Sequence, residues 1–244
     1  TIDSGKKAYN GGAAYGEFLL LLHDLPPELL TETIPDFHNV EYRLDNLEKA
    51  VQEDPLGRAG EVGQDIRFLR ERKTEMVQIL QAGKRDELPL RITHNDTKFN
   101  NILFDDEEQV IGVVDLDTVM PGYVHYDFGD AIRTGASKAA EDEKNTDRME
   151  LDLGLFEAFT AGYLSKTYAF LTKEEIDFLP LSAKLLTYIM AVRFLTDYIC
   201  GDIYYRISHA RHNLQRARTQ IKLIQDMELH YSDMITCVER LASL

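Results

Sequence analysis

The stretch that most constrains the fold runs from residue 90 to residue 133. A short β-type run at 90–93 leads into a polar segment, HNDTKFNN, at 94–101. Two apolar runs follow, ILF at 102–104 and VIGVV at 110–114, and the residues between them are polar. Two short apolar runs separated by a polar turn predict a β-hairpin. The second run delivers the acidic triplet DLD, a Pro-Gly turn is expected soon after it, and DFGD at 127–130 is expected to open a helix.

The spacing of the polar residues fits the requirements of phosphoryl transfer. In protein kinases, a catalytic Asp precedes a metal-binding Asn by five positions, and a later Asp binds the same nucleotide-bound metal. Here Asp96 and Asn101 are five positions apart, after His94. Asp96 is therefore predicted to orient and deprotonate an attacking hydroxyl group. Asn101 is predicted to bind Mg²⁺ on the nucleotide through its amide oxygen.

Three charged residues extend this predicted site. Asp115, at the end of the second hairpin strand, is the expected carboxylate ligand of the metal. Asp117 is expected on the same face by the two-residue period of a strand, where it could bind a second metal ion. Lys98 could neutralise charge on the transferred phosphoryl group. The alternative is an acidic hairpin with solvated turn residues, which is the expected state of 105–108.

Three other residues are predicted to support the loop. His94 is expected to pack and to hydrogen-bond the loop, and no proton transfer is expected from it. Asp127 is expected to brace the same loop by accepting hydrogen bonds. Arg133 is expected either to pair with the carboxylates of residues 127–130 or to contact a phosphate.

At these residues the sequence resembles the aminoglycoside phosphotransferase/choline kinase family. Within it, the bacterial N-acetylhexosamine 1-kinases are the subfamily that the chain resembles, over segments along the whole sequence: HNDTKFNNILF, VVDLDTVMPG, YDFGDAIRTGAS, IPDFHN, LGRAG, MAVRFLTDY, GDIYY and RTQIKLIQDME. The resemblance implies a kinase-like C-terminal lobe that transfers the γ-phosphate of ATP to the anomeric hydroxyl of N-acetylglucosamine or N-acetylgalactosamine. It implies that Asp96 is the base, that Asn101 and Asp115 are the Mg²⁺ ligands, and that Arg193 and Tyr204 line the sugar pocket.

The surroundings of Arg193 independently favour a site, because an arginine in an otherwise apolar helix must find a partner or a cleft. His38 and Arg43 could also be ligand groups. A helix-start histidine and a surface arginine are the expected roles for that pair.

Composition limits the partners and the compartment. The net charge of −15 leaves no basic surface for nucleic acid, and an anionic nucleotide then requires a divalent metal. Cys200 and Cys237 are far apart and are expected to be ordinary thiols in a reducing compartment. No apolar run of membrane-spanning length and no signal peptide are expected, so the predicted location is the cytoplasm.

The predicted fold class is α+β and mostly α, a protein kinase-like C-terminal lobe over residues 13–244 that follows a hinge or linker at 1–12. Helices are expected at 13–23, 36–53 (with Asp36 as N-cap), 61–82 (closed by Gly83), 151–168, 173–178, 180–200 and 210–242. Residues 137–149 are expected to be a loop.

A kinase also has a smaller lobe with a glycine-rich loop and a strand lysine that contact the nucleotide phosphates. Neither feature is present in this sequence. We therefore expect the N-terminal ATP lobe to be absent, the chain to be the C-terminal lobe of a longer enzyme, and its activity to be weak or nil. Two alternatives remain open: a kinase for another small alcohol (choline, an aminoglycoside or another sugar), and a non-catalytic kinase-fold binding module.

Overall fold

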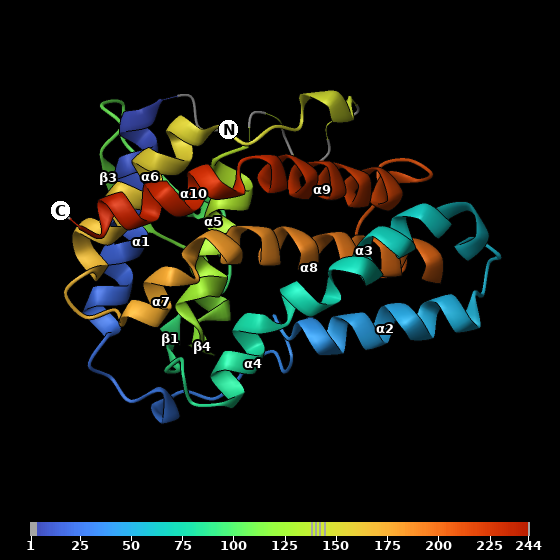
Figure 1. Cartoon of the computed structure of the whole chain (residues 1–244), viewed down its shortest axis with the longest axis horizontal. Helices are drawn as coiled ribbons and strands as arrows, with labels where there is room; N and C mark the ends of the chain where they lie inside the picture. Colours follow the sequence, from blue (N-terminus) through green and yellow to red (C-terminus); the bar gives the residue numbers. More distant parts are fainter. Residues whose placement is uncertain (1–3, 138, 140, 142, 144, 244) are drawn as a thin grey trace.

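The computed structural model describes residues 4–137, 139, 141, 143 and 145–243. The described part is mostly helical, with two small antiparallel sheets, which confirms the predicted α+β, mostly α class (Figure 1). Its α-helices are α1 (Gly5–Leu22), α2 (Val40–Glu53), α3 (Gly63–Met76), α4 (Gln78–Lys84), α5 (Val124–Gly135), α6 (Leu153–Thr167), α7 (Lys173–Asp177), α8 (Leu179–Cys200), α9 (His212–Leu229) and α10 (Tyr231–Leu241).

Two pairs of short strands surround the predicted site. Strands β2 (Ile102–Phe104) and β3 (Val110–Val113) pair with Ile102 opposite Val113, so the predicted hairpin is confirmed. Strand β1 (Arg91–Thr93) pairs with β4 (Met120–Gly122). The turn expected at Pro121-Gly122 is wrong, because both residues belong to β4. Proline is tolerated there because a two-stranded sheet leaves one side of each strand unpaired.

Helix α8 runs through the middle of the molecule, between α9 and the pair α2 and α3 (Figure 1). Apolar side chains of α2, α3, α8 and α9 form one buried cluster, and those of α1, α5, α6 and α10 form the other. Contrary to the sequence-based expectation, α8 is long and apolar enough to cross a membrane. However, 89% of its apolar 18-residue stretch is buried in the fold, which is typical of the core helix of a soluble protein.

The linker predicted over residues 1–12 is wrong for the helical residues 5–12, and residues 1–3 lie outside the described part. Ser4 caps α1 by accepting a hydrogen bond from the Lys7 backbone N–H at 3.1 Å. A Cβ atom at Gly12 would lie 2.1 Å from the Phe159 carbonyl oxygen, and one at Gly162 would lie 2.0 Å from that of Tyr9. These glycines therefore allow α1 and α6 to pack backbone against backbone.

Other predicted boundaries also differ from the structure. Helix α2 is capped by Asn39 in place of Asp36, which has a positive φ of 57°. The helix expected over 61–82 is divided at Val77, and Gly83 lies inside the second piece, α4. The helix expected over 210–242 is divided at His230. Apolar spacing did not reveal these breaks, because a one-residue interruption leaves the apolar residues on the buried side.

Candidate active site

The loop predicted to be catalytic, residues 94–101 and called the catalytic loop below, is held in place by the first turns of α5. The Asp127 carboxylate accepts hydrogen bonds from the backbone N–H groups of His94 (2.9 Å) and Asn95 (2.7 Å), and its carbonyl oxygen accepts one from Thr97. Burial raises the pKa of Asp127 to about 6, although the two N–H donors oppose that shift. Asn95 has a φ of 64°, so the loop turns sharply just before Asp96.

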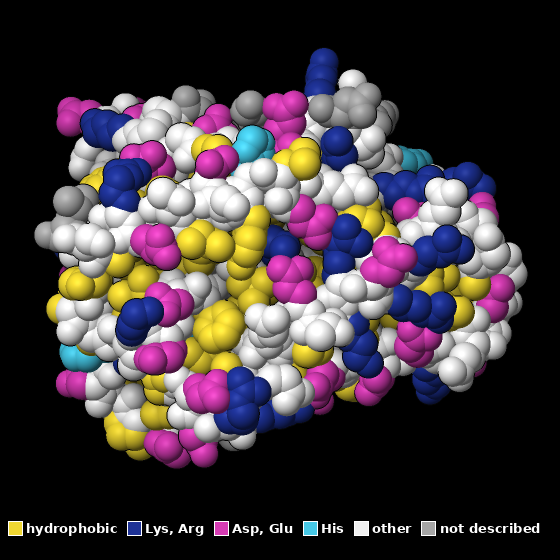
Figure 2. All heavy atoms as spheres, viewed as in Figure 1, with side chains coloured by type: hydrophobic (Ala, Val, Ile, Leu, Met, Phe, Trp, Pro, Cys, Tyr) yellow, Lys and Arg dark blue, Asp and Glu magenta, His cyan; other side chains and the backbone are white. Residues whose placement is uncertain are grey.

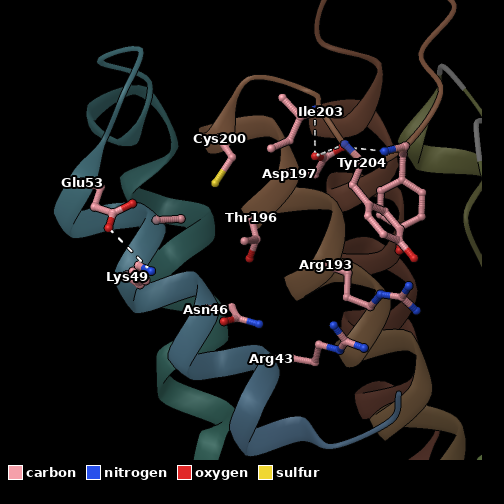
Figure 3. A pocket seen from close by; sticks show the side chains of 12 residues that line it. Arg43, Asn46, Lys49, Glu53, Arg193, Thr196, Asp197, Cys200, Ile203 and Tyr204 are labelled. Atoms are coloured by element: carbon pink, nitrogen blue, oxygen red, sulfur yellow. Dashed lines mark hydrogen bonds and ion pairs between the residues drawn. The ribbon is translucent and has the colours of Figure 1, made fainter. Parts of the chain in front are cut away.

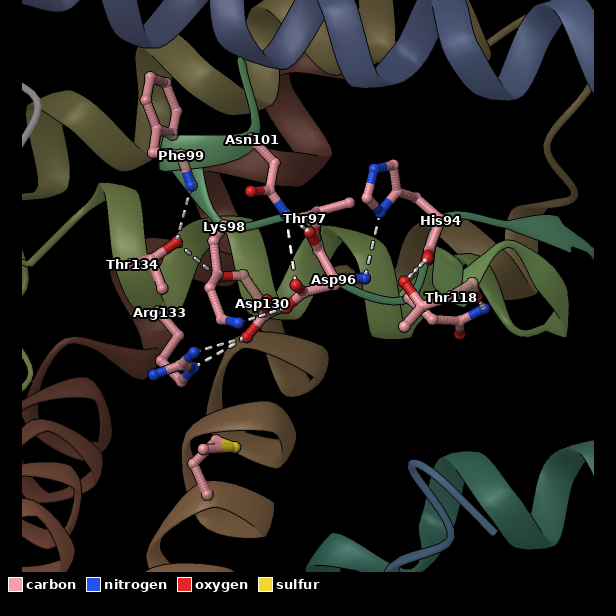
Figure 4. A network of polar contacts seen from close by, with 12 residues as sticks. His94, Asp96, Thr97, Lys98, Phe99, Asn101, Thr118, Asp130, Arg133 and Thr134 are labelled. Carbon is pink, nitrogen blue, oxygen red and sulfur yellow. Dashed lines mark hydrogen bonds and ion pairs between the residues drawn. The ribbon is translucent and has the colours of Figure 1, made fainter. Parts of the chain in front are cut away.

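The Asp96 side chain lies between two other residues of the loop (Figure 4). Lys98 Nζ is 2.7 Å from Asp96 Oδ1, and Asn101 Nδ2 donates to the Asp96 carbonyl oxygen at 2.8 Å and to Oδ2 at 3.3 Å. The Asp96 side chain is 18% exposed, so its carboxylate remains accessible to a substrate hydroxyl. In this structure the Lys98 ammonium group forms an ion pair with Asp96, the candidate base.

The hairpin register brings Asn101 close to the end of β3. The Val114 N–H donates to the Asn101 carbonyl oxygen at 2.9 Å, and Asp115 follows directly. Because the amide nitrogen of Asn101 is bound to Asp96, its Oδ1 is the side-chain atom left to hold a cation. Asp115 is exposed and has a left-handed backbone (φ 65°).

These two residues fit a Mg²⁺ ion that is also bound by nucleotide phosphates, because such ions use one or two carboxylates and keep several other ligands. Among the described residues, no group of three or more His, Cys, Asp or Glu side chains could hold a metal ion by itself. A site of this kind is complete only when the nucleotide supplies its share of the ligands.

The argument that placed Asp117 beside Asp115 is wrong. Strand β3 ends at Val113, and Asp117 lies in a short 3-10 helix (Leu116–Thr118), so the alternation of a strand does not reach it. Its carbonyl oxygen accepts a hydrogen bond from Thr33 at 3.4 Å, and its side chain is exposed. The strand period therefore gives no reason to place Asp117 on the same face as Asp115.

His94 and Arg133 lie in the interior. The His94 ring bonds the Val114 carbonyl oxygen through Nε2 (3.1 Å) and the Asp96 N–H through Nδ1 (3.3 Å). Arg133 contacts Asp130 Oδ1 at 2.9 Å through Nε and Glu141 Oε2 at 2.5 Å through a terminal nitrogen. Burial lowers the pKa of Arg133, but the two carboxylates outweigh it and raise that pKa above its usual range. Both side chains therefore make their polar contacts within the protein.

Arg193 and Tyr204 line one cavity of about 320 Å³ between α2 and α8 (Figure 3). Arg43, expected at the surface, lines the same cavity beside Arg193. His38, expected at a helix start, is buried before α2 and donates through Nε2 to the Asn95 carbonyl oxygen at 2.9 Å. The sequence in and before α2 gave no signal for the position of either side chain, because their placement depends on α8 and on the catalytic loop.

A comparison with known families agrees with this geometry. Residues 2–172, which include the whole catalytic loop and the hairpin, match the model of the phosphotransferase enzyme family (APH). The chain belongs to this family. Phosphotransferases of the family in general use ATP and Mg²⁺, which fits the incomplete ligand set at Asn101 and Asp115.

This phosphotransferase has a second cavity, of about 600 Å³, between α1 and the β2–β3 hairpin. Its lining is mainly apolar and ends at Leu116, the residue after Asp115. It is formed by Asn10, Ala13, Ala14, Glu17, Phe18, Leu21, Gln109, Val110, Gly112, Val113, Leu116 and Lys166. The sequence gave no indication of this cavity, because its walls come from α1 and the hairpin, which lie far apart in the chain.

The surface has no continuous basic region on the face shown in Figure 2, where acidic and basic side chains are interspersed. On this face, the distribution is unlike the basic stripe with which proteins bind nucleic acid phosphates.

Proposed function

We propose that this phosphotransferase transfers the γ-phosphoryl group of ATP to the anomeric hydroxyl of N-acetylglucosamine or N-acetylgalactosamine. One observation carries the proposal: a single loop presents a partly exposed carboxylate, Asp96, in contact with Asn101, and the hairpin register brings the residue before Asp115 to Asn101. A phosphotransferase needs these two functions, a base and a cation site, in adjacent positions.

Each residue then has a defined task. Asp96 orients the sugar hydroxyl and accepts its proton, and Asn101 keeps the Asp96 side chain in position through its amide N–H groups. Asn101 Oδ1 and Asp115 would hold Mg²⁺, which when bound neutralises charge on the nucleotide phosphates. Lys98, 2.7 Å from Asp96, can exchange that carboxylate for the incoming phosphoryl oxygens. Asp117 remains a weaker candidate for a second ion.

The apolar cavity between α1 and the hairpin is the proposed place for the nucleotide base. It is bounded by Phe18, Leu21 and Val113, and it adjoins the turn that carries Asp115. A flat aromatic base gains free energy when it leaves water for such a lining. The phosphates would then extend toward Asp115 and Asn101.

The cavity between α2 and α8 supports a sugar over a cationic acceptor. Arg43 and Arg193 lie side by side at one end of it, so choline or an aminoglycoside would meet like charge there (Figure 3). The exposed ring of Tyr204 offers an apolar surface for a pyranose. The choice of an N-acetylhexosamine rests on the sequence resemblance.

Phosphorus NMR tests the reaction. The enzyme used in the test carries the N-terminal ATP lobe that we expect a kinase of this type to need. It is incubated with Mg-ATP and each N-acetylhexosamine, beside Asp96→Asn and, as a matched control, Asp106→Asn on the exposed hairpin turn. We expect a sugar 1-phosphate signal with wild type and the control, and a rate about a thousandfold lower with Asp96→Asn. No sugar phosphate from either sugar with a folded protein would overturn the acceptor assignment, and an unchanged Asp96→Asn rate would overturn the base.

A further inference from the structure

We propose that the cavity between α2 and α8 binds a phosphate group, specifically that of a phosphorylated hexose. The site rests on the charges of the cavity alone. The choice of a hexose phosphate rests in addition on the proposed function, because such a compound is the product of that reaction.

The first observation is that two guanidinium groups share this cavity without a counter-charge. Among the described residues, neither Arg43 nor Arg193 has a carboxylate within ion-pair distance. Arg43 donates to the Phe37 carbonyl oxygen at 2.9 and 3.3 Å. Burial lowers the pKa of Arg43, and the neighbouring charge of Arg193 lowers it further. Two like charges in a partly desolvated cavity are unfavourable until an anion joins them.

The second observation is that aromatic rings and a thioether surround the Arg193 guanidinium. Its central carbon lies 5.3 Å from the ring centre of Phe37, 5.9 Å from that of Tyr204 and 5.5 Å from that of Tyr205. One terminal nitrogen lies 3.7 Å from Met190 Sδ. Ring faces orient a guanidinium but use few of its five N–H donors, so most of these donors remain available.

The acidic residues of the cavity are already engaged elsewhere. Asp197 accepts the backbone N–H groups of residues 203–205 at 2.8–3.0 Å and the Asn213 amide at 2.8 Å. Glu53 lies 3.9 Å from Lys49 at the far end of the cavity (Figure 3). Asp197 therefore holds the tyrosine segment over Arg193, and its charge is compensated by its own donors.

Size, charge and polar groups together indicate the ligand. A cavity of about 320 Å³ can hold a compact ligand such as a hexose phosphate. A phosphomonoester carries close to two negative charges at neutral pH, which match two guanidinium groups, and arginine binds such oxygens in a forked geometry. The Tyr205 hydroxyl is buried and has no hydrogen-bond partner among the described residues, so a ligand oxygen would satisfy it. In a protein of net charge −15, such a local positive site is what allows an anion to bind.

The cavity is connected to the catalytic loop by three contacts. Phe37 lies under Arg193, its ring centre is 4.5 Å from that of His38, and His38 Nε2 donates to the Asn95 carbonyl oxygen, next to Asp96. A phosphate bound by the two arginines would thus lie close to the Phe37–His38 segment, which supports the loop. Product binding there would slow further turnover.

Calorimetric titration in the absence of nucleotide tests the proposal. The ligands are N-acetylglucosamine 1-phosphate, the neutral sugar and inorganic phosphate. We expect the sugar phosphate to bind at least about tenfold more tightly than the neutral sugar, and Arg43→Gln to remove that advantage. Lys49→Gln, on the same helix and in the same cavity, should change binding by less than about twofold because Lys49 is an exposed partner of Glu53.

A second variant covers the case in which Arg43→Gln does not fold. Asn46→Asp adds a carboxylate one turn from Arg43 and removes no described hydrogen bond, so it should weaken sugar-phosphate binding about fivefold.

Equal affinity for the phosphorylated and neutral sugars, or unchanged binding in both Arg43→Gln and Asn46→Asp, would overturn the proposal. Inorganic phosphate that binds as tightly as the sugar phosphate would support the anion site and overturn the hexose assignment. Because no nucleotide is present, failure of the proposed kinase reaction would leave these results unaffected.

Discussion

The catalytic loop and the cavity between α2 and α8 differ in whether their charged side chains are paired. In and around the loop, charged and polar groups are paired within the protein: Asp127 with two backbone N–H groups, Asp96 with Lys98, and Arg133 with two carboxylates. In the cavity, Arg43 and Arg193 face each other with no described carboxylate partner. The comparison distinguishes charged groups that stabilise the fold from charged groups that we propose bind an anionic ligand. It also predicts how mutations in the two regions will differ.

The largest loss of stability is expected from Arg133→Met. It leaves Asp130, whose side chain is 6% exposed, as a buried and uncompensated charge, so the free energy of unfolding should fall by about 3–5 kcal/mol. Urea denaturation at neutral pH measures the change. Adding Asp130→Asn to Arg133→Met should recover part of the loss. A single variant as stable as wild type would show that the buried pair does not hold the loop region.

Asp127→Ala comes next. It removes the acceptor of the His94 and Asn95 N–H groups, and each buried N–H without a partner costs about 1–3 kcal/mol. We expect a loss of about 2–4 kcal/mol by denaturation. Asp127→Asn keeps one acceptor oxygen and should fall between wild type and Asp127→Ala. Equal stability of all three proteins would contradict the bracing role.

His38 connects the two regions and makes their stability depend on pH. Burial lowers its pKa from 6.5 to about 4, so the unfolded chain binds a proton in that interval and the folded chain does not. The stability contributed by neutral His38 is complete above pH 6.5 and is lost as the pH falls toward 4, by at most about 1.4 kcal/mol per pH unit.

His38→Gln removes this titration and keeps an N–H donor for the Asn95 carbonyl oxygen. Buried His125, whose pKa is also lowered to about 4, remains in the variant, so the slope of unfolding free energy between pH 4 and 6.5 should become smaller without vanishing. Denaturation at several pH values gives the slope. Identical slopes for wild type and variant would contradict the assignment.

The smallest effect is expected from Arg193→Met. The variant loses contacts to aromatic rings but also loses the repulsion between Arg193 and Arg43, so the unfolding free energy should change by no more than about 0.5 kcal/mol. Denaturation beside Arg133→Met provides the direct contrast. A loss of more than about 2 kcal/mol would mean that Arg193 stabilises the fold as Arg133 does.

The sequence was sufficient for features that depend on short-range pattern. The hairpin of β2 and β3 follows from two apolar runs around a polar turn, and most helices follow from apolar spacing. The closeness of Asn101 to Asp115 then follows from the hairpin register. Helix breaks at Val77 and His230 were missed, because they do not interrupt that spacing.

Features that depend on long-range packing could not be read from the sequence. Gly11 and Gly12 read as a linker because glycine disfavours isolated helices, yet the packing of Gly11 against the Phe99 ring and of Gly12 against α6 outweighs that preference. The position of Asp117 was wrong because Asp115 adopts a left-handed backbone that ends the strand alternation. The shared cavity of Arg43 and Arg193 depends on how α2 lies against α8, which no local pattern encodes.

The glycine contact between α1 and α6 limits which positions can be varied when the acceptor specificity of this protein is engineered. Tyr15, one turn beyond Gly12, donates its hydroxyl to the Lys98 carbonyl oxygen at 2.7 Å, so the spacing of two helices fixes the neighbour of the candidate base. A single methyl group at Gly12 or Gly162 would move α1 and carry that anchor with it. A selection for new acceptors should therefore randomise Arg43 and its cavity, and should leave both glycines untouched although they lie outside the cavity.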